Sequence, residues 1–513
     1  MPTDRCTRLF LVPAVVFIAT AMDRNYQTDL WHHLARGRAI IRENRLLDED
    51  RFTFTVHGQA LQDVNWGWQV LFFRLHSIGG LPLVQTVNSA LLAVMILLLL
   101  MFAWRRSGSL SASVAVCIIA FFGLWQLLII RPQTLSLLLF VLLVGMLEEA
   151  TRRRWLLFFP PIVMAIWVNV HGGFPIGLVL IGCYVVAAFL ERFWPREISS
   201  TSPERQRRVF PWLICFLLCL LSTLANPYGW RVYEYVRLTS SRASGRPIDE
   251  WLPPSLDLLT GKIWAISLVL LLMGLAFSRR RSNWREICLI LCFLPPACGS
   301  VRMVAWWLLV STPILATRFA DLLSRLRHLD STDDRASLGN AFACCTLAGA
   351  MVLSIPNLEA FNPFLSRPGR AHRAESDLQA LADFLREEGK AERIFTRFDW
   401  GEYLGWSLAP RSTVFMDGRI EIIPDEIWMH YTAVTRGRAD WEEILDHYGV
   451  DCLVLDVSGY HHDLLPLVER SMTWRQVQQQ GNAVLFVRRA SADTNYRQRT
   501  LVRPSNSANP VSH

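Results

Sequence analysis

The chain has 513 residues, of which 52% are hydrophobic and only 19% are charged, and its formal net charge is +8. Apolar residues are gathered in blocks such as 91–103, 135–147 and 263–277, which are separated by arginine clusters. This pattern is typical of a polytopic membrane protein. It excludes a soluble enzyme, a disordered chain and a disulfide scaffold, while the length leaves room for one soluble domain of about 150 residues.

The positive charge is carried almost entirely by arginine, because only Lys262 and Lys390 are lysines. In a membrane protein a basic excess is first a topology signal, so we expect no nucleic-acid partner. Of the 11 cysteines only Cys452 lies in a clearly polar region. Their spacing indicates neither a disulfide framework nor a zinc site.

The apolar blocks predict a transmembrane domain over residues 1–355 with about eleven spans. Several are shorter than the roughly 20 residues that a straight span needs. The joints Arg131-Pro132 and Pro295-Pro296 are either turns between helices or kinks within them. The predicted spans are 8–22, 81–103, 111–130, 134–150, 155–170, 174–191, 210–225, 262–278, 284–299, 302–318 and 340–355.

The arginine distribution predicts a cytoplasmic N-terminus. With that orientation the inside loops hold 20 arginines, whereas the short outside turns near 131, 171 and 300 hold only Arg131 and Arg302. An odd number of spans then places the C-terminal domain outside the cytoplasm. Alternatively, the first apolar segment is a signal peptide ending at Ala19-Thr20-Ala21, which leaves the orientation unchanged.

Two regions are predicted to lie outside the membrane. The first is a loop over 23–80 with interfacial helices at 28–44 and 66–78. The second is a soluble α/β domain over 356–490, followed by a disordered tail over 491–513. In this domain we predict a helix over 376–388 capped by Ser376, strands at 393–398, 413–416, 452–456 and 484–487, and helices near 402–408, 425–435 and 440–447.

The strongest cluster of reactive side chains opens the first outside loop. Asp29 and His33 are four residues apart and therefore share a helix face, where a carboxylate can orient an imidazole or share a proton or a metal with it. The alternative is that Asp29 caps the helix and Trp31 anchors it at the membrane surface. Further along, Asp48-Glu49-Asp50 matches a short divalent-metal pattern, although an acidic turn accounts for it equally well.

The other outside turns place polar residues beside apolar spans. Ionisable groups at membrane depth usually line a cavity or pair with a partner. Arg131 and Arg302 are suited to grip a phosphate group. The alternative is ordinary turn chemistry with snorkelling arginines. The remaining turn residues of interest are Asn169, His171 and Tyr228.

Several motifs together resemble a group of bacterial polytopic membrane proteins similar to the GT-C superfamily of glycosyltransferases, which includes protein mannosyltransferases and lipid A sugar transferases. The resemblance runs from about residue 20 to 490. The motifs are Asp29-x-Trp31-x-His33-x-x-x-Gly37, Asp50-x-Phe52-Thr53-Phe54-Thr55, the Trp-containing helix ending in Gly79-Gly80, Val168-Asn169-x-His171-Gly172-Gly173, Asn226-Pro227-Tyr228-Gly229-Trp230, Asp399-Trp400-Gly401 and Asp417-Gly418-Arg419.

This resemblance implies a GT-C-like bundle in the bacterial cytoplasmic membrane that moves a sugar from a polyprenyl-phosphate carrier to a lipid, glycan or protein acceptor outside. It makes Asp29 the base and Asp50 a second acid, and the expected catalytic residues are Asp29, Asp50 and His33. The residues expected to bind substrate are Arg131, His171, Asn169, Tyr228, Arg302 and Trp31. The resemblance names no cofactor, and it leaves open whether a divalent metal is needed.

Two departures from the family pattern keep other functions open. Relatives often carry an acid where this chain has Gln27, and often a His-Glu-Trp run where it has Trp66-Gly67-Trp68. A lipid-linked-sugar transporter would need polar residues buried midway along several spans. A non-catalytic envelope scaffold would need only the C-terminal domain to bind a partner.

Overall fold

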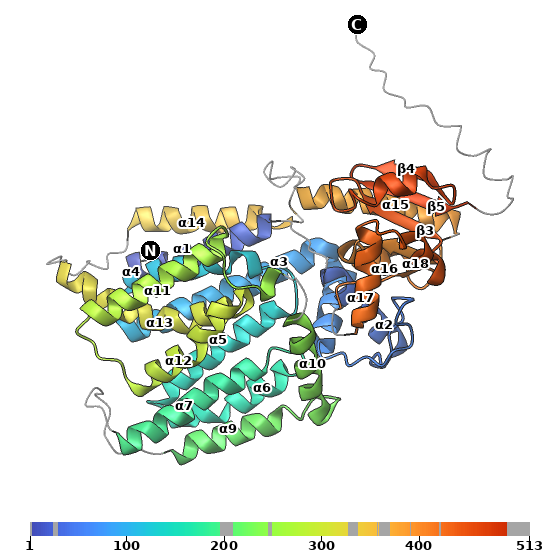
Figure 1. Cartoon of the computed structure of the whole chain (residues 1–513). Coiled ribbons are helices and arrows are strands. Elements are labelled where there is room, and N and C mark those ends of the chain that lie inside the picture. Colours follow the sequence, from blue (N-terminus) through green and yellow to red (C-terminus); the bar gives the residue numbers. More distant parts are fainter. Residues whose placement is uncertain are drawn as a thin grey trace, which may run out of the picture.

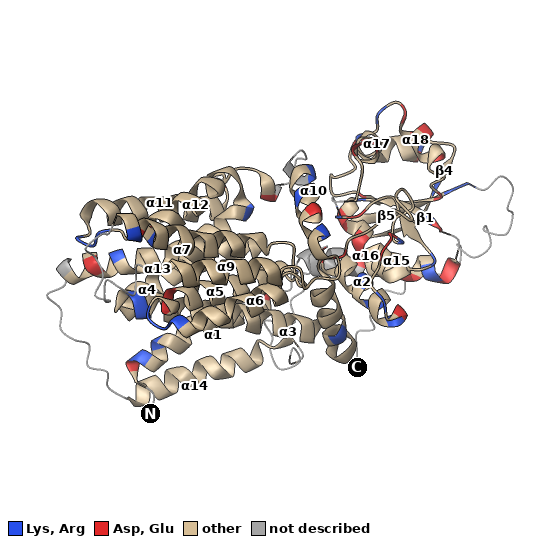
Figure 2. Cartoon of the chain, turned by 90° about the horizontal axis from the view of Figure 1, so that it is seen from below, with Lys and Arg blue, Asp and Glu red and all other residues tan. Residues whose placement is uncertain are grey.

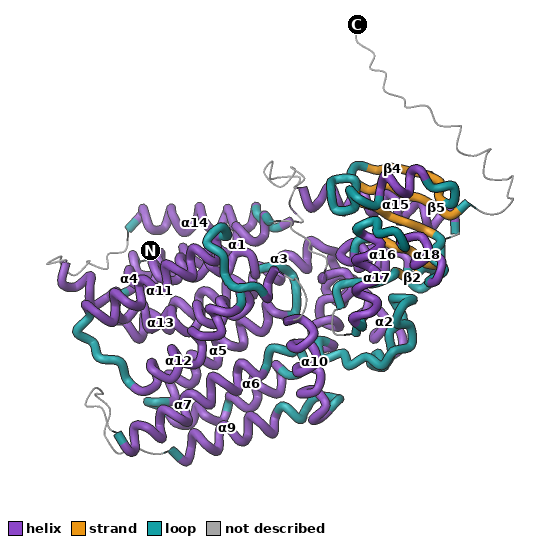
Figure 3. The backbone as a smooth tube through the Cα atoms, viewed as in Figure 1, coloured by secondary structure: helices purple, strands orange, loops and turns teal. Residues whose placement is uncertain are grey.

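A computed structural model describes residues 3–23, 29–194, 209–244, 249–326, 337–356, 358, 370–389, 391–419 and 422–489. Figure 1 shows a long helical bundle joined at one end to a smaller domain, and Figure 3 shows that the strands lie in the smaller domain. The two parts meet around the first loop of the chain. Gln27, Thr28 and the predicted tail over 491–513 lie outside the described residues.

The bundle is built from helices whose side chains are apolar on every face, as a membrane requires. Charged side chains gather at the ends of the bundle, and its middle is nearly free of them (Figure 2). The bundle helices are α1 (Asp4–Met22), α3 (Trp66–Ser107), α4 (Leu110–Leu124), α5 (Gln133–Ala150), α6 (Pro160–Trp167), α7 (Pro175–Phe193), α9 (Phe210–Ser222), α11 (Leu259–Phe277), α12 (Trp284–Gly299), α13 (Val301–Leu326) and α14 (Leu338–Leu353).

All eleven predicted spans contain a helix, but in the described residues only seven helices are long and apolar enough to cross a membrane. Three shorter apolar helices occupy 154–167, 210–222 and 338–353. The count of eleven therefore stays a prediction, whereas the multi-pass helical class is confirmed. Arg131-Pro132 forms a turn between helices, and Pro295-Pro296 lies inside α12.

Two helices of the bundle place the site. The window of α13 that could cross the membrane is 89% buried, which makes this helix the centre of the bundle. Helix α3 joins the predicted interfacial helix over 66–78 to the following span, with non-helical backbone at Gly79 and Gly80. Gly80 has a φ of 64°, a conformation that glycine adopts without strain.

The C-terminal domain contains a five-stranded mixed sheet with the order β2-β1-β3-β5-β4. Strand β1 pairs in parallel with β2 and β3, whereas β5 pairs antiparallel with β3 and β4. The strands are β1 (Arg393–Thr396), β2 (Thr413–Val414), β3 (Cys452–Asp456), β4 (Trp474–Gln480) and β5 (Ala483–Arg488), and the helices are α15 (Arg370–Glu388), α16 (Phe398–Leu408), α17 (Asp425–Thr435), α18 (Trp441–His447) and α19 (Leu465–Arg470).

Two features of this domain differ from the sequence-based expectation. Helix α15 begins at Arg370, so Ser376 is an interior residue and its prediction as N-cap is wrong. Strand β4 was not predicted, because its polar run of Arg475 and several glutamines lacks the apolar alternation of a half-buried strand. It forms because β5 offers a complete antiparallel edge.

The first loop fastens the C-terminal domain to the bundle. Its helix α2 (Asp29–Glu43) packs on α16, where the rings of Trp31 and Tyr403 lie 4.9 Å apart, edge to face. Residues 52–54 extend the edge of the sheet, since Val414 donates to the Phe52 carbonyl and accepts from Phe54 N–H, both at 3.1 Å. This pairing covers an edge strand that would otherwise be open.

Candidate active site

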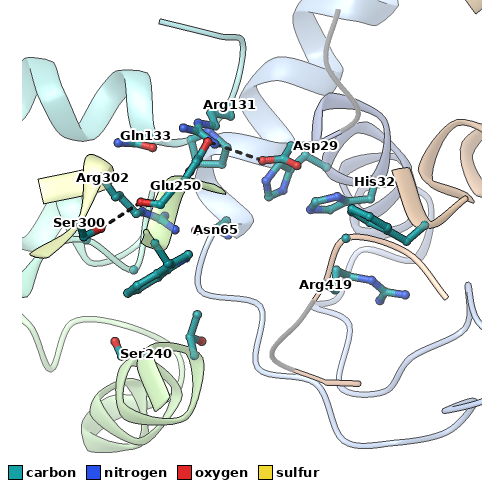
Figure 4. A pocket seen from close by; sticks show the side chains of 18 of the residues that line it. Asp29, His32, Asn65, Arg131, Gln133, Ser240, Glu250, Ser300, Arg302 and Arg419 are labelled. Atoms are coloured by element: carbon teal, nitrogen blue, oxygen red, sulfur yellow. Dashed lines mark hydrogen bonds and ion pairs between the residues drawn. The ribbon is translucent and has the colours of Figure 1, made fainter. Parts of the chain in front are cut away.

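A cavity of about 970 Å³ lies where the bundle, helix α10 (Val232–Ser244) and the C-terminal domain meet (Figure 4). Each of the three parts contributes polar side chains to its wall. From the first loop and the bundle these are Asp29, His32, His33, Asn65, Arg131, Gln133, His171, Glu250 and Arg302, and from the C-terminal domain they include Arg419, Thr432, Tyr460 and Asp463.

Arg131 is the centre of the charged wall. Its Nη1 lies 2.8 Å from Glu250 and 3.6 Å from Asp29 (Figure 4). The residue is only 7% exposed, yet its Nε and Nη2 have no hydrogen-bond partner among the described residues. A buried guanidinium with two unused N–H groups carries a high desolvation cost. Because Arg131 lines the cavity, the charge of an anion bound there would offset part of this cost.

Two helix N-termini reinforce this preference for an anion. Arg131 comes just before α5, and Arg302 is the second residue of α13. The guanidinium of Arg302 lies 5.3 Å from the ring of Trp251, which directs it along the same wall. The positive ends of two helix dipoles therefore add to two arginines. Gln133 is 1% exposed, and neither atom of its amide has a partner among the described residues, so it supplies further polar contacts.

The two acids of this wall are held in different states. Burial opposes ionisation of Glu250, but Arg131 and Arg302 outweigh it and keep the pKa of Glu250 below its ordinary value. Burial raises the pKa of Asp29, and Glu250 adds to this rise while Arg131 and Arg302 oppose it. The Asp29 side chain is 41% exposed, and this surface faces the cavity. Asp29 is thus the carboxylate that more readily accepts a proton.

His33 and His171 are neutral donors. Gln69 donates to Nδ1 of His33 at 3.1 Å, and its nitrogen is identified because it also donates to Asp63. Gly173 N–H donates to Nδ1 of His171 at 3.1 Å. In each ring the proton is therefore on Nε2. Burial, followed by nearby positive groups, holds the pKa of both imidazoles well below the usual value.

Five of the predicted site residues line this cavity: Asp29, His33, Arg131, His171 and Arg302. They come from four separate turns of the sequence and meet at one end of the bundle. The other four, Asp50, Asn169, Tyr228 and Trp31, do not line it. Trp31 instead packs between α2 and α16, 4.9 Å from Tyr403 and 6.2 Å from Trp406.

Asp50 is fully buried and forms an ion pair with Arg419 of the C-terminal domain. Its other oxygen accepts from the backbone and hydroxyl of Thr53, at 3.0 and 2.5 Å. Asp48, two residues earlier, is 72% exposed and faces Arg45 instead. The two carboxylates of the Asp48-Glu49-Asp50 pattern therefore point to different partners. Among the described residues no three His, Cys, Asp or Glu side chains form a metal cluster, so no metal ligand is assigned.

Asn169 and Tyr228 hold the first loop against the bundle. The side-chain oxygen of Asn169 accepts from Trp66 Nε1 at 3.0 Å, and its backbone carbonyl oxygen accepts from Gly67 N–H at 2.9 Å. Tyr228 accepts from Asp63 N–H at 2.9 Å. A Cβ atom at Gly67 would lie 2.6 Å from the Asn169 carbonyl oxygen. Gly67, which stands where relatives often have a glutamate, thus makes a close backbone contact that leaves no room for a side chain.

Two acids near the site were missed from the sequence. Glu250 lies directly before Trp251, in a segment that the predicted topology places on the same side of the membrane as Arg131. An acid beside a tryptophan on that side could have been chosen as a site candidate from the sequence. Glu402 lies in the middle of α16 and is 2% exposed. Only docking of α16 on α2 brings it against His32 of the cavity wall, so no local pattern could reveal it.

The fold is similar to solved structures of membrane glycosyltransferases. The archaeal oligosaccharyltransferase AglB from Archaeoglobus fulgidus, in complex with an inhibitory peptide and a dolichol-phosphate, superposes with a TM-score of 0.56 at 11% identity, covering 95% of this chain and 74% of that chain. ArnT from Cupriavidus metallidurans, bound to undecaprenyl phosphate, has a TM-score of 0.51 at 13% identity, covering 94% and 98%. No family model and no curated protein sequence matches the chain. The chain therefore shares its overall fold with these AglB and ArnT structures.

Proposed function

We propose that the protein is a multi-pass membrane glycosyltransferase that transfers a sugar from a polyprenyl-phosphate donor to an envelope acceptor. The observation that carries this proposal is the buried guanidinium of Arg131, with two unused N–H groups beside Asp29 in the cavity. Arg131 and Asp29 thus place a cation for an anionic group and a candidate base close enough together to contact the same ligand. The lipids bound in the AglB and ArnT structures are a dolichol-phosphate and an undecaprenyl phosphate, which correspond to the carrier part of such a donor and are the ligand class that would fit this site.

In this mechanism Asp29 takes the proton from an acceptor hydroxyl as the hydroxyl oxygen attacks the anomeric carbon of the donor sugar. The bond from that carbon to the phosphate oxygen breaks, and the polyprenyl phosphate leaves with both bonding electrons. Arg131 and Arg302 stabilise the charge that develops on the phosphate. The Nε2–H groups of His33 and His171 donate to sugar or phosphate oxygens.

We assign a positioning role to the predicted residues outside the cavity. Asp50 holds Arg419 at the domain junction, and Asn169 and Tyr228 hold the first loop. Trp31 stabilises the contact between α2 and α16. In the proposed topology the N-terminus is cytoplasmic, and the cavity and the C-terminal domain lie on the outer face of the bacterial cytoplasmic membrane.

The proposal is tested by transfer of radiolabelled sugar from a panel of polyprenyl-phosphate hexoses and pentoses, with purified protein in detergent and delipidated envelope fractions as acceptors. We expect one donor to lose label to the acceptor with wild type, and Asp29→Asn to lower the rate by about 100- to 10,000-fold. Asp48→Asn is the matched control, because this acid is exposed on the same loop.

Full activity of Asp29→Asn would remove Asp29 from the role of base. Absence of transfer across the panel, by protein that still binds undecaprenyl phosphate, would contradict the enzymatic proposal. Such a result would favour transport of a lipid-linked sugar or a scaffold role for the same fold.

A further inference from the structure

Glu402 and His32 form a buried contact between the two domains at the edge of the cavity. The Oε2 atom of Glu402, on α16, lies 3.2 Å from Nδ1 of His32, on α2. The Glu402 side chain is 1% exposed, and that of His32 is 12% exposed. Neither atom has a hydrogen-bond partner among the described residues, so the contact is a short separation and not an aligned hydrogen bond. A proton on one of the two atoms would remove the repulsion between two bare lone pairs at this separation.

The charges around the contact decide which partner holds that proton. Glu402 faces three carboxylates, those of Asp29, Asp417 and Asp399, so an ionised Glu402 would add a fourth negative charge. His32 faces the guanidinium groups of Arg36 and Arg419, which disfavour an imidazolium more than Asp417 favours it. The neutral acid with the neutral imidazole is therefore the more stable arrangement of the pair.

The second oxygen of Glu402 is fixed by the C-terminal domain. Its Oε1 accepts from Gly418 N–H at 3.1 Å. A Cβ atom at Gly418 would lie 2.0 Å from Oε1 and 3.9 Å from an oxygen of Asp29, so the bare backbone of Gly418 separates the two acids. With Oε1 accepting, Oε2 is the oxygen left to carry a proton, and it lies on the side of His32.

The structure of this contact leads to a role for Glu402 that rests on the proposed function. We propose that Glu402 is a protonated positioning residue, which donates its O–H to Nδ1 of His32 and so presents the Nε2–H of His32 to a substrate oxygen bound beside Asp29. Burial, then the three neighbouring carboxylates, raises the pKa of Glu402 well above its usual value, in agreement with this geometry.

This role completes a pattern in the cavity wall. Nδ1 of His33 accepts from Gln69, and Nδ1 of His171 accepts from Gly173 N–H. With Nδ1 of His32 accepting from Glu402, all three imidazoles would carry their proton on Nε2, and all three line the cavity. Figure 4 shows His32 next to Asp29 on this wall. The third donor exists only when the C-terminal domain is docked, because Glu402 belongs to that domain.

The protonation state is tested by infrared spectroscopy of the purified full chain at neutral pH, without substrate. We expect the wild type to show the C=O stretching band of a buried protonated carboxylic acid, and Glu402→Gln to lose it. Glu392→Gln removes an exposed carboxyl of the same domain and is expected to keep the band. A wild-type minus Glu402→Gln spectrum that contains only carboxylate bands would overturn the proposal.

Transfer activity tests the consequence for the site. Glutamine can donate N–H to Nδ1 of His32 and accept from Gly418 N–H, so Glu402→Gln should stay within about threefold of wild type, whereas Glu402→Ala should fall by about tenfold or more. If Glu402→Ala fails to fold, Glu402→Gln still decides the matter. A Glu402→Gln rate at least tenfold below wild type would show that a negative charge is needed and overturn the neutral-donor role. The infrared result is independent of transfer, so failure of the glycosyltransferase proposal is distinguishable from failure of this one.

Discussion

Both ends of the helical bundle contain buried arginines, but the arginines at the two ends differ in how many carboxylates pair with them. At the end away from the C-terminal domain, Arg106 pairs with Glu286 at 2.5 Å and Glu148 at 3.3 Å, and Arg318 reaches Glu286 at 2.9 Å. At the cavity end, Arg131 has one close carboxylate and two unused N–H groups. Nε of Arg318 also lacks a partner among the described residues, but Arg318 and Arg106 do not line the cavity, whereas Arg131 does. The comparison teaches that a buried, partly unpaired charge indicates a binding site only where it also lines a cavity.

The largest expected effect is on stability at the paired end. Arg106→Gln leaves Glu148 without its 3.3 Å partner and removes one of two arginines from Glu286. Breaking a buried ion pair costs about 3–5 kcal/mol, and we expect the lower end because Glu286 keeps Arg318. A lower Tm in detergent would show this. An unchanged Tm would mean that the cluster at this end is not structural.

At the cavity end, Arg131→Gln is expected to lower transfer activity and to leave the stability nearly unchanged. It should lower transfer by about 100- to 1000-fold, because the developing phosphate charge loses its main partner. The Tm should change little, since the released Glu250 is 29% exposed to the cavity. Arg153→Gln, at a 66% exposed position, is the matched control. Normal transfer by Arg131→Gln would remove the distinction between the two ends.

The pH profile sharpens the electrostatic account of the cavity end. Asp29 must be ionised to act as base, so transfer should fall as the pH drops through its pKa, which burial raises above the usual 3.8. Glu250 raises this pKa further, so Glu250→Gln should move the acid limb to lower pH. Arg302 lowers it, so Arg302→Gln should move the limb to higher pH. Shifts in the same direction for both variants would contradict the charge assignments.

The smallest effect is expected at Tyr228, which lies beside the cavity without lining it. Tyr228→Phe removes one hydrogen bond from Asp63 N–H and should lower stability by about 1 kcal/mol. The KM for the lipid donor should stay unchanged. A several-fold rise in KM would restore Tyr228 to the substrate-binding residues that its sequence motif suggests.

The sequence predicted the helical segments well, because a membrane requires long apolar runs that are visible without any tertiary information. Asp29 and His33 were recognised because an acid and an imidazole four residues apart share a helix face. Arg131, His171 and Arg302 were recognised because polar residues in short turns between apolar spans usually line a cavity or pair with a partner.

The features that the sequence did not reveal depend on long-range contacts. The ion pair of Asp50 with Arg419, far along the chain, could not be predicted from the residues around Asp50. Glu402 is buried only because α16 docks on α2, and strand β4 forms because β5 offers an edge. Such contacts leave no periodic or local signal in the residues that make them.

The most direct test of the central claim is equilibrium binding of undecaprenyl phosphate to purified wild type, Arg131→Gln and Asp29→Asn. The account predicts that Arg131→Gln weakens binding by at least about tenfold, since the unused N–H groups are lost. Asp29→Asn should bind as tightly as wild type or more tightly, because a negative charge near the phosphate is removed. Equal affinity of wild type and Arg131→Gln would contradict the assignment of this cavity to a polyprenyl phosphate.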